Sequence, residues 1–102
     1  MLVILGKSPF VGDYESILDI AFRAVHKGEK VGVIHIHDSC IALKSDEYCK
    51  KLVDAGLAVY ALEADCKARG LMKKINEGVK IVDYKYWVRL VMNEYDGIVS
   101  WI

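Results

Sequence analysis

The stretch Val31-Gly32-Val33-Ile34-His35-Ile36-His37-Asp38 decides the fold class of this chain. Its first six residues are apolar almost throughout, and a polar cluster follows them. A short run of this kind is typical of a strand that helices cover on both faces. Four more runs share this character: Met1 to Leu5, Leu57 to Leu62, Val79 to Val82 and Ile98 to Ile102. The sequence therefore predicts five strands in a mainly parallel sheet.

Segments of helical period separate these predicted strands. The first has a buried stripe and lies between Asp13 and Gly28; its stripe residues are Tyr14, Ile17, Leu18, Ala21, Phe22 and Val25. The second starts at Ser45 and stops at Gly56, with four residues expected to point inward: Tyr48, Cys49, Leu52 and Val53. A short helix is expected from Ala64 to Arg69. The last helix is capped by Asp83 and directs four side chains toward the sheet: Tyr84, Trp87, Val88 and Val91.

Alternating strands and helices of this kind connect by right-handed crossovers. We therefore predict an α/β fold, a three-layer α/β/α sandwich with a five-stranded sheet, over a single domain of residues 1–102. Ligands in such folds gather beyond the carboxyl ends of the strands. Chemistry is expected first in the segments that begin at Gly6, His37, Glu63 and Asp83.

Composition excludes several classes of function. The chain has 14 basic and 14 acidic residues, so no long-range field attracts nucleic acid or an anionic membrane directly. Its longest apolar run is far shorter than the roughly 18 residues of a membrane span. Met1 to Leu5 lacks the basic leader of a signal peptide. Three cysteines with no CxxC pair suit a reducing compartment, so a cytoplasmic location is expected.

The end of the second predicted strand carries the main candidate chemistry. Cys40 follows it closely, and nearby His37 and Lys44 are expected to lower the thiol pKa. A thiolate there would accept sulfur as a persulfide. The alternative is that Cys40 is a small buried core residue. His35 and His37, with Cys40, also provide half of a possible metal site, against the alternative of histidines hydrogen-bonded at a strand end.

Three weaker candidates lie elsewhere. Gly6-Lys7-Ser8 resembles the end of a phosphate-binding loop but lacks the earlier glycine that such a loop needs. Cys66 opens the third helix, where neighbouring Glu63 and Asp65 are expected to raise its pKa, and Asp65 has the character of a capping residue. Four residues indicate an association surface, with a packed terminal strand as the alternative: Tyr86, Arg89, Trp101 and Ile102.

With these residues in place, the chain resembles the DsrH/TusB family of sulfur-relay subunits, in the wider DsrE-like group. The similarity runs from end to end and depends on the order and spacing of these residues: Met1-Leu2, Ser8-Pro9-Phe10, Asp38, Ala42, Tyr48, Val59-Tyr60-Ala61-Leu62, Asp65, Ala68-Arg69-Gly70-Leu71, Val82-Asp83-Tyr84, Val88, Leu90 and Trp101. Two departures are that Asp38-Ser39 replaces the frequent Asp-Gly, and that Cys40 matches no known family role.

The resemblance implies a DsrEFH-like fold and a cytoplasmic subunit of a persulfide-transfer complex. That complex serves 2-thiolation of the tRNA wobble uridine or intracellular sulfur oxidation. The implied partners are DsrE/TusD-like and DsrF/TusC-like subunits or identical chains. Sister subunits carry an active cysteine just after the third strand, where this chain has Leu62. The resemblance thus implies an accessory or non-catalytic subunit that needs no cofactor.

Three hypotheses follow. The first is a relay subunit that contributes Cys40 as a persulfide acceptor by thiolate attack, with no metal or nucleotide. The second is a non-catalytic, homo-oligomeric assembly module without sulfur chemistry. The third is a metal-binding or small-ligand protein that uses His35, His37 and Cys40.

Overall fold

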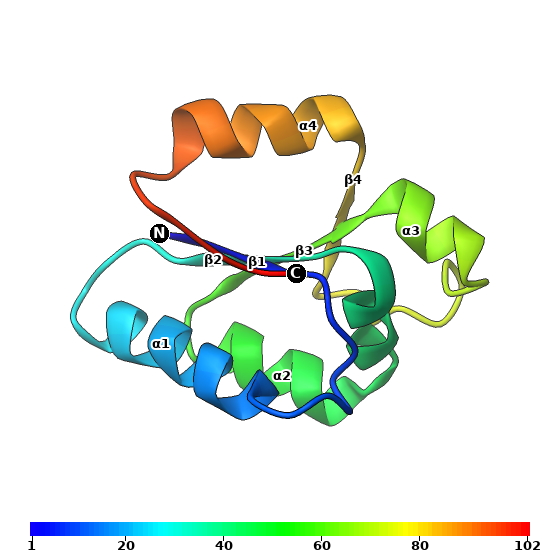
Figure 1. Ribbon diagram of the computed structural model, residues 1–102, viewed down its shortest axis with the longest axis horizontal. Helices are drawn as coiled ribbons and strands as arrows, with labels where there is room; N and C mark the ends of the chain where they lie inside the picture. The colour runs from blue at the N-terminus through cyan, green and yellow to red at the C-terminus, as the bar shows by residue number, and fades with distance from the viewer.

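The chain forms one sheet of five strands in the order β4-β3-β2-β1-β5, and every neighbouring pair is parallel (Figure 1). This computed structural model describes residues 1–102. The strands are β1 (Leu2–Leu5), β2 (Gly32–His35), β3 (Ala58–Leu62), β4 (Lys80–Val82) and β5 (Ile98–Trp101). The predicted fold class is confirmed, and the sheet is parallel throughout.

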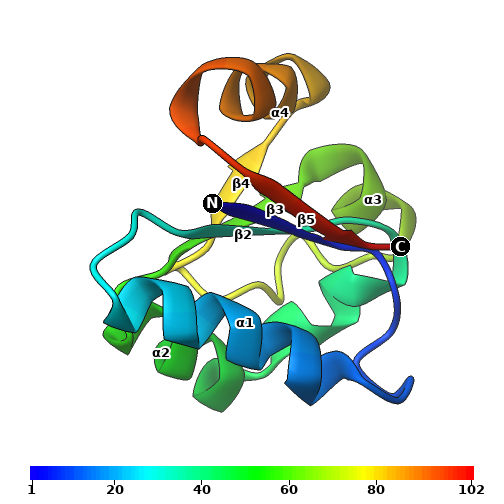
Figure 2. The same cartoon turned by 60° about the vertical axis from the view of Figure 1, so that its left-hand side comes forward.

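Helices cover the two faces of the sheet unequally. On one face lie α1 (Tyr14–His26) and α2 (Asp46–Asp54), whereas α4 (Tyr84–Arg89) lies alone on the other (Figure 2). One π-helical turn, η2 (Leu90–Glu94), extends α4. At the carboxyl ends of the strands, a 3-10 helix, η1 (His37–Lys44), follows β2 and α3 (Glu63–Ala68) follows β3. No helix has both the length and the apolar content to cross a membrane.

The sheet separates two apolar cores of different size. Nineteen buried residues lie on the side of α1 and α2, and eight on the side of α4. Successive residues of β2 alternate between them: Val33 belongs to the larger core and Ile34 to the smaller. Since β2 is central and buried on both faces, its sequence is apolar nearly throughout. The larger core is the side on which the candidate chemistry is found.

Side-chain caps begin two of the helices as predicted. Ser45 Oγ accepts a hydrogen bond from the backbone N–H of Tyr48, and Asp83 Oδ1 accepts one from the N–H of Tyr86. Asp13, by contrast, precedes α1 in a left-handed conformation with no capping bond from its side chain. The helix ends at Gly28, Gly56 and Gly70 all have positive φ, as expected for C-terminal glycines.

The predicted inward side of α4 is right for two residues and wrong for two. Trp87 and Val91 pack against the smaller core as expected, whereas Tyr84 and Val88 are more than half exposed. Leu90, in η2, is the residue that enters the core, and Tyr86 packs against Tyr60 of β3. In α2, likewise, Val53 points to solvent, whereas Tyr48, Cys49 and Leu52 are at least half-buried as predicted. A helix of six residues provides too few turns for its apolar period to fix its buried side.

Candidate functional site

The carboxyl ends of β2 and β3 carry the residues singled out by the sequence. Ion pairs and hydrogen bonds hold η1 and α3 together there. Asp65 Oδ2 accepts a hydrogen bond of 2.8 Å from the backbone N–H of His37, so its carboxylate caps η1 and not its own helix. The Arg69 guanidinium donates from Nε (3.2 Å) and Nη2 (3.0 Å) to Asp38 Oδ1. These contacts fix the segment that contains Cys40.

Cys40 is completely buried in the larger core, so the alternative of a small core residue describes its position, and it is not a surface thiol. Its Sγ donates a hydrogen bond of 3.4 Å to the carbonyl oxygen of His35. The pKa of Cys40 is raised, first by its interaction with the neighbouring thiol of Cys66 and then by burial; nearby Asp65 adds to this. The predicted lowering by His37 and Lys44 is therefore wrong. In this conformation Cys40 presents no thiolate to a donor.

The other two thiols are buried as well. Cys66, on α3, belongs to the larger core with Cys40, and its interaction with the Cys40 thiol lowers the pKa of Cys66. The expected net increase is wrong, although Asp65 does act in that direction. Cys49 donates to the Leu43 carbonyl oxygen, and burial raises its pKa. No thiol of this chain is therefore open to solvent.

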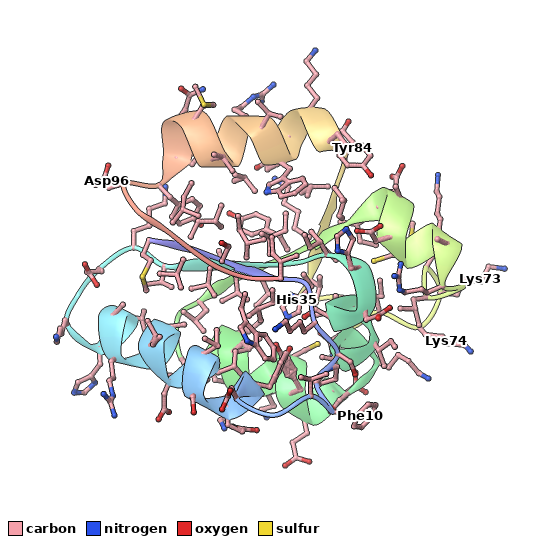
Figure 3. All side chains as sticks on the ribbon, viewed as in Figure 1. Phe10, His35, Lys73, Lys74, Tyr84 and Asp96 are labelled. Carbon is pink, nitrogen blue, oxygen red and sulfur yellow. The ribbon has the colours of Figure 1, made fainter.

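A chain of hydrogen bonds crosses the larger core beside these thiols. His35 lies fully buried between the sheet and the helices α1 and α2 (Figure 3). Its Nδ1 is 3.1 Å from the Tyr60 carbonyl oxygen and its Nε2 is 2.6 Å from the Tyr48 hydroxyl. A carbonyl only accepts, so Nδ1 carries the proton and Tyr48 donates to Nε2. Tyr14 then donates to the Tyr48 oxygen at 2.8 Å.

His35 is neutral in this hydrogen-bonded network. Burial lowers the pKa of His35 to about 4, since no counter-charge lies against the ring to offset its desolvation. Burial also raises the pKa of Tyr48 far above its usual value, with Tyr14 adding to the effect. Both groups are uncharged at neutral pH, so the hydrogen bonds that link α1, α2 and β2 are between neutral groups. Sequence reasoning missed it, although Tyr48 was among the residues of the resemblance.

The half-site for a metal is not assembled. His35 is buried, whereas His37 begins η1 with φ of 49° and is exposed, so the two imidazoles diverge. Both ring nitrogens of His35 already have hydrogen-bond partners. No three His, Cys, Asp or Glu side chains converge as metal ligands would. The structure does not bring His35, His37 and Cys40 together as the third hypothesis requires.

A groove of about 580 Å³ lies between the N-terminal turns of α1 and α2. Tyr14 and Tyr48 line it, and Phe10 stands at its edge, 87% exposed (Figure 3). Its border has two acidic and two basic side chains, so it favours no ligand charge: Glu15, Glu47, Lys44 and Lys51. The groove therefore identifies no substrate class.

The residues predicted to form an aromatic association surface differ in exposure. Tyr86 is half-buried, and its hydroxyl accepts a hydrogen bond of 2.6 Å from Lys80 Nζ. Trp101 is half-buried against Tyr14, with ring centroids 5.4 Å apart. Ile102 is exposed, as is Tyr84 at the beginning of α4 (Figure 3). Of the four residues predicted to form this surface, Arg89 and Ile102 are thus exposed, and Tyr86 and Trp101 are half-buried.

Comparison with known proteins gives consistent matches along the whole chain. Residues 7–96 match the family described as "DsrH like protein". A "Protein TusB" from Photorhabdus laumondii is 30% identical over 96 residues, or 93% of this chain and 95% of the relative. A "Protein TusB" from Escherichia coli O157:H7 is also 30% identical, over 99% of this chain and all of the relative. The curated relatives thus correspond to this chain in length.

Two solved structures share the fold. The ychN protein from E. coli superposes with a TM-score of 0.80 and 15% sequence identity, over 98% of this chain and 97% of that one. A protein of unknown function, MTH1491 from Methanobacterium thermoautotrophicum, superposes with a TM-score of 0.73 and 16% identity, over 97% of each chain. At these identities the similarity establishes the architecture alone.

Proposed function

The chain belongs to the DsrH family, and from this we propose that it is a subunit of a cytoplasmic sulfur-relay complex that supports 2-thiolation of the tRNA wobble uridine. Its relatives of equal length carry the name TusB. The proposed partners are DsrE/TusD-like and DsrF/TusC-like chains, and the sulfur passes through their cysteines. Service in intracellular sulfur oxidation is the corresponding role in an organism that oxidises sulfur.

Within that complex, we assign this chain an accessory role without a reactive thiol of its own. The observation that carries this is the burial of Cys40, Cys49 and Cys66, each with 0% exposure. A sulfur carrier has to reach the terminal sulfur of a donor persulfide as a thiolate. Leu62, which ends β3 where the sister subunits carry their thiol, is an apolar core residue.

Cys40 as a persulfide acceptor stays a second proposal, and it rests on the place of Cys40 just beyond the carboxyl end of β2. The Cys40 thiolate would attack the terminal sulfur of a donor persulfide; the donor S–S bond breaks, the donor leaves as a thiolate, and Cys40 holds the new persulfide. This requires η1 to move away from α3, which breaks the bonds of Asp38 and Asp65 described above. The conformation in which η1 is bonded to α3 therefore opposes the reaction.

Reconstitution tests the proposed function. The chain is co-expressed with the DsrE-like and DsrF-like chains of its own organism, and sulfur transfer from a ³⁵S-persulfide donor is measured with and without it. We expect all three chains to co-elute, and we expect transfer to fall when this chain is omitted. Separate elution, or transfer that does not depend on this chain, would contradict membership of the complex.

A further inference from the structure

The face of the sheet that carries α4 is one helix short. Two helices cover the opposite face, whereas α4 and η2 alone cover this one (Figure 2). Ile98 of β5 pairs in register with Leu2, whose side chain belongs to the smaller core, so Ile98 points to the same face. It remains 48% exposed, on the edge strand of the sheet. Apolar surface is thus left uncovered beside α4.

α4 and η2 carry a further set of exposed apolar side chains. Tyr84, Val88 and Met92 follow one another at intervals of four residues, which places them along one side of the helix; we call them the outer stripe. Their exposed fractions are 58%, 59% and 72%. Contiguous exposed apolar side chains on a small protein mark an interaction site more often than single ones do.

One irregular feature lies within the outer stripe. Met92 belongs to the π-helical turn η2, and π-helical turns are found frequently at functional sites. The Trp87 ring, in contrast, packs inward against the smaller core. The π-helical turn is therefore the irregular feature that an interaction surface on this side would include.

The charge beside the outer stripe indicates what kind of chain this is. The segment Lys80–Arg89 carries Lys80, Lys85 and Arg89, and none of these forms an ion pair within the molecule. Two copies of α4 packed antiparallel across a two-fold axis would place the basic side chains of both copies along the same edge. A second copy is therefore disfavoured, and acidic side chains on a different protein fit this edge.

We propose that the outer stripe, with Ile98, is the surface through which this chain binds a sister subunit of the relay complex. The partner presents aliphatic side chains bordered by Asp and Glu. This inference rests on the proposed function, and it names the contact surface that the proposed function leaves open. Buried apolar side chains at the centre of the contact provide affinity, while the basic border speeds association at low salt.

The test measures the affinity of this chain for the co-purified DsrE-like and DsrF-like chains by biolayer interferometry. The double variant Val88→Glu/Met92→Glu places two acidic groups on the outer stripe. The matched control is Ile20→Glu, a partly exposed apolar residue on α1, on the opposite side of the molecule. Circular dichroism checks that the variants fold, as expected for substitutions of exposed side chains.

We expect the double variant to bind at least tenfold more weakly than wild type, and Ile20→Glu to bind as wild type does. Lys85→Glu is expected to weaken binding most at low salt. Equal binding by the double variant, or loss of binding only in Ile20→Glu, would overturn the assigned surface. Self-association that the double variant abolishes would make a second copy the occupant and would equally overturn the proposal. If the wild-type chain binds neither sister chain, the proposed function itself fails.

Discussion

The hydroxyl of Tyr48 is predicted to be among the most important polar groups for stability. It donates to His35 Nε2 at 2.6 Å and accepts from Tyr14 at 2.8 Å. In Tyr48→Phe, the buried His35 nitrogen loses its donor and the Tyr14 hydroxyl loses its acceptor. A buried polar group without a partner costs about 1–3 kcal/mol. Because the groove gives water some access to Tyr14, we expect a total loss of about 3 kcal/mol.

Tyr14→Phe is the matched control. It removes one hydrogen bond at the end of the chain but leaves the bond between Tyr48 and His35 intact. The expected loss is about 1 kcal/mol. For a chain of this length, the melting temperature falls by roughly 4–8 °C for each kcal/mol, so Tyr48→Phe is expected to melt about 12–24 °C below wild type.

Urea unfolding monitored by circular dichroism at pH 7 gives the free energy of unfolding for both variants. The reasoning predicts that Tyr48→Phe loses about three times as much as Tyr14→Phe, with an unchanged dependence on urea concentration. Equal losses, or a loss below about 1 kcal/mol for Tyr48→Phe, would refute the assigned direction of the hydrogen bonds. Nitrogen NMR of wild type should also find His35 neutral with its proton on Nδ1.

Three further outcomes are expected. The pKa of His35 lies near 4 in the folded chain, below the ordinary 6.5. Keeping His35 neutral therefore contributes fully to the free energy of unfolding above about pH 6.5, and this contribution falls by about 3 kcal/mol as the pH decreases to 4. Urea titrations at several pH values should find that the free energy of unfolding depends less on pH in His35→Leu and depends on it as in wild type in His26→Gln. Native iodoacetamide labelling followed by mass spectrometry should modify all three cysteines slowly, with Cys66 ahead of Cys40 when the protein opens; rapid labelling of Cys40 would refute its burial. Arg69→Ala removes the contact with Asp38 and is expected to cost about 1 kcal/mol and to speed labelling of Cys40, whereas Lys73→Ala should do neither.

The sheet could be predicted from the sequence because the pattern that indicates each strand lies within a few consecutive residues. Apart from His35, Val31–Ile36 is apolar on both faces, as expected for a strand between two layers of helix. The same holds for α1, where thirteen residues repeat the period several times. In α4 the period is sampled over six residues and then interrupted by a π-helical turn, so Tyr84 and Val88 were wrongly assigned to the buried side.

The candidate site was harder to predict because it depends on contacts distant in sequence. Cys40 is buried where η1 meets α3. Asp65 bonds to His37, 28 positions earlier in the sequence, and Arg69 bonds to Asp38, 31 positions earlier. His35 and His37 diverge because His37 takes a positive φ, which no spacing rule anticipates. Asp38 and Arg69 were both noted as residues of the resemblance, and only the structure joins them.

The central claim is that this chain supports sulfur transfer without carrying the sulfur. It is tested most directly by locating ³⁵S in the reconstituted complex after single turnover, with wild-type chain and with Cys40→Ala. We predict label on the sister subunits and none on this chain, and an unchanged rate of transfer with Cys40→Ala. Label that a thiol reductant removes from Cys40, together with a loss of transfer in the variant, would contradict the claim.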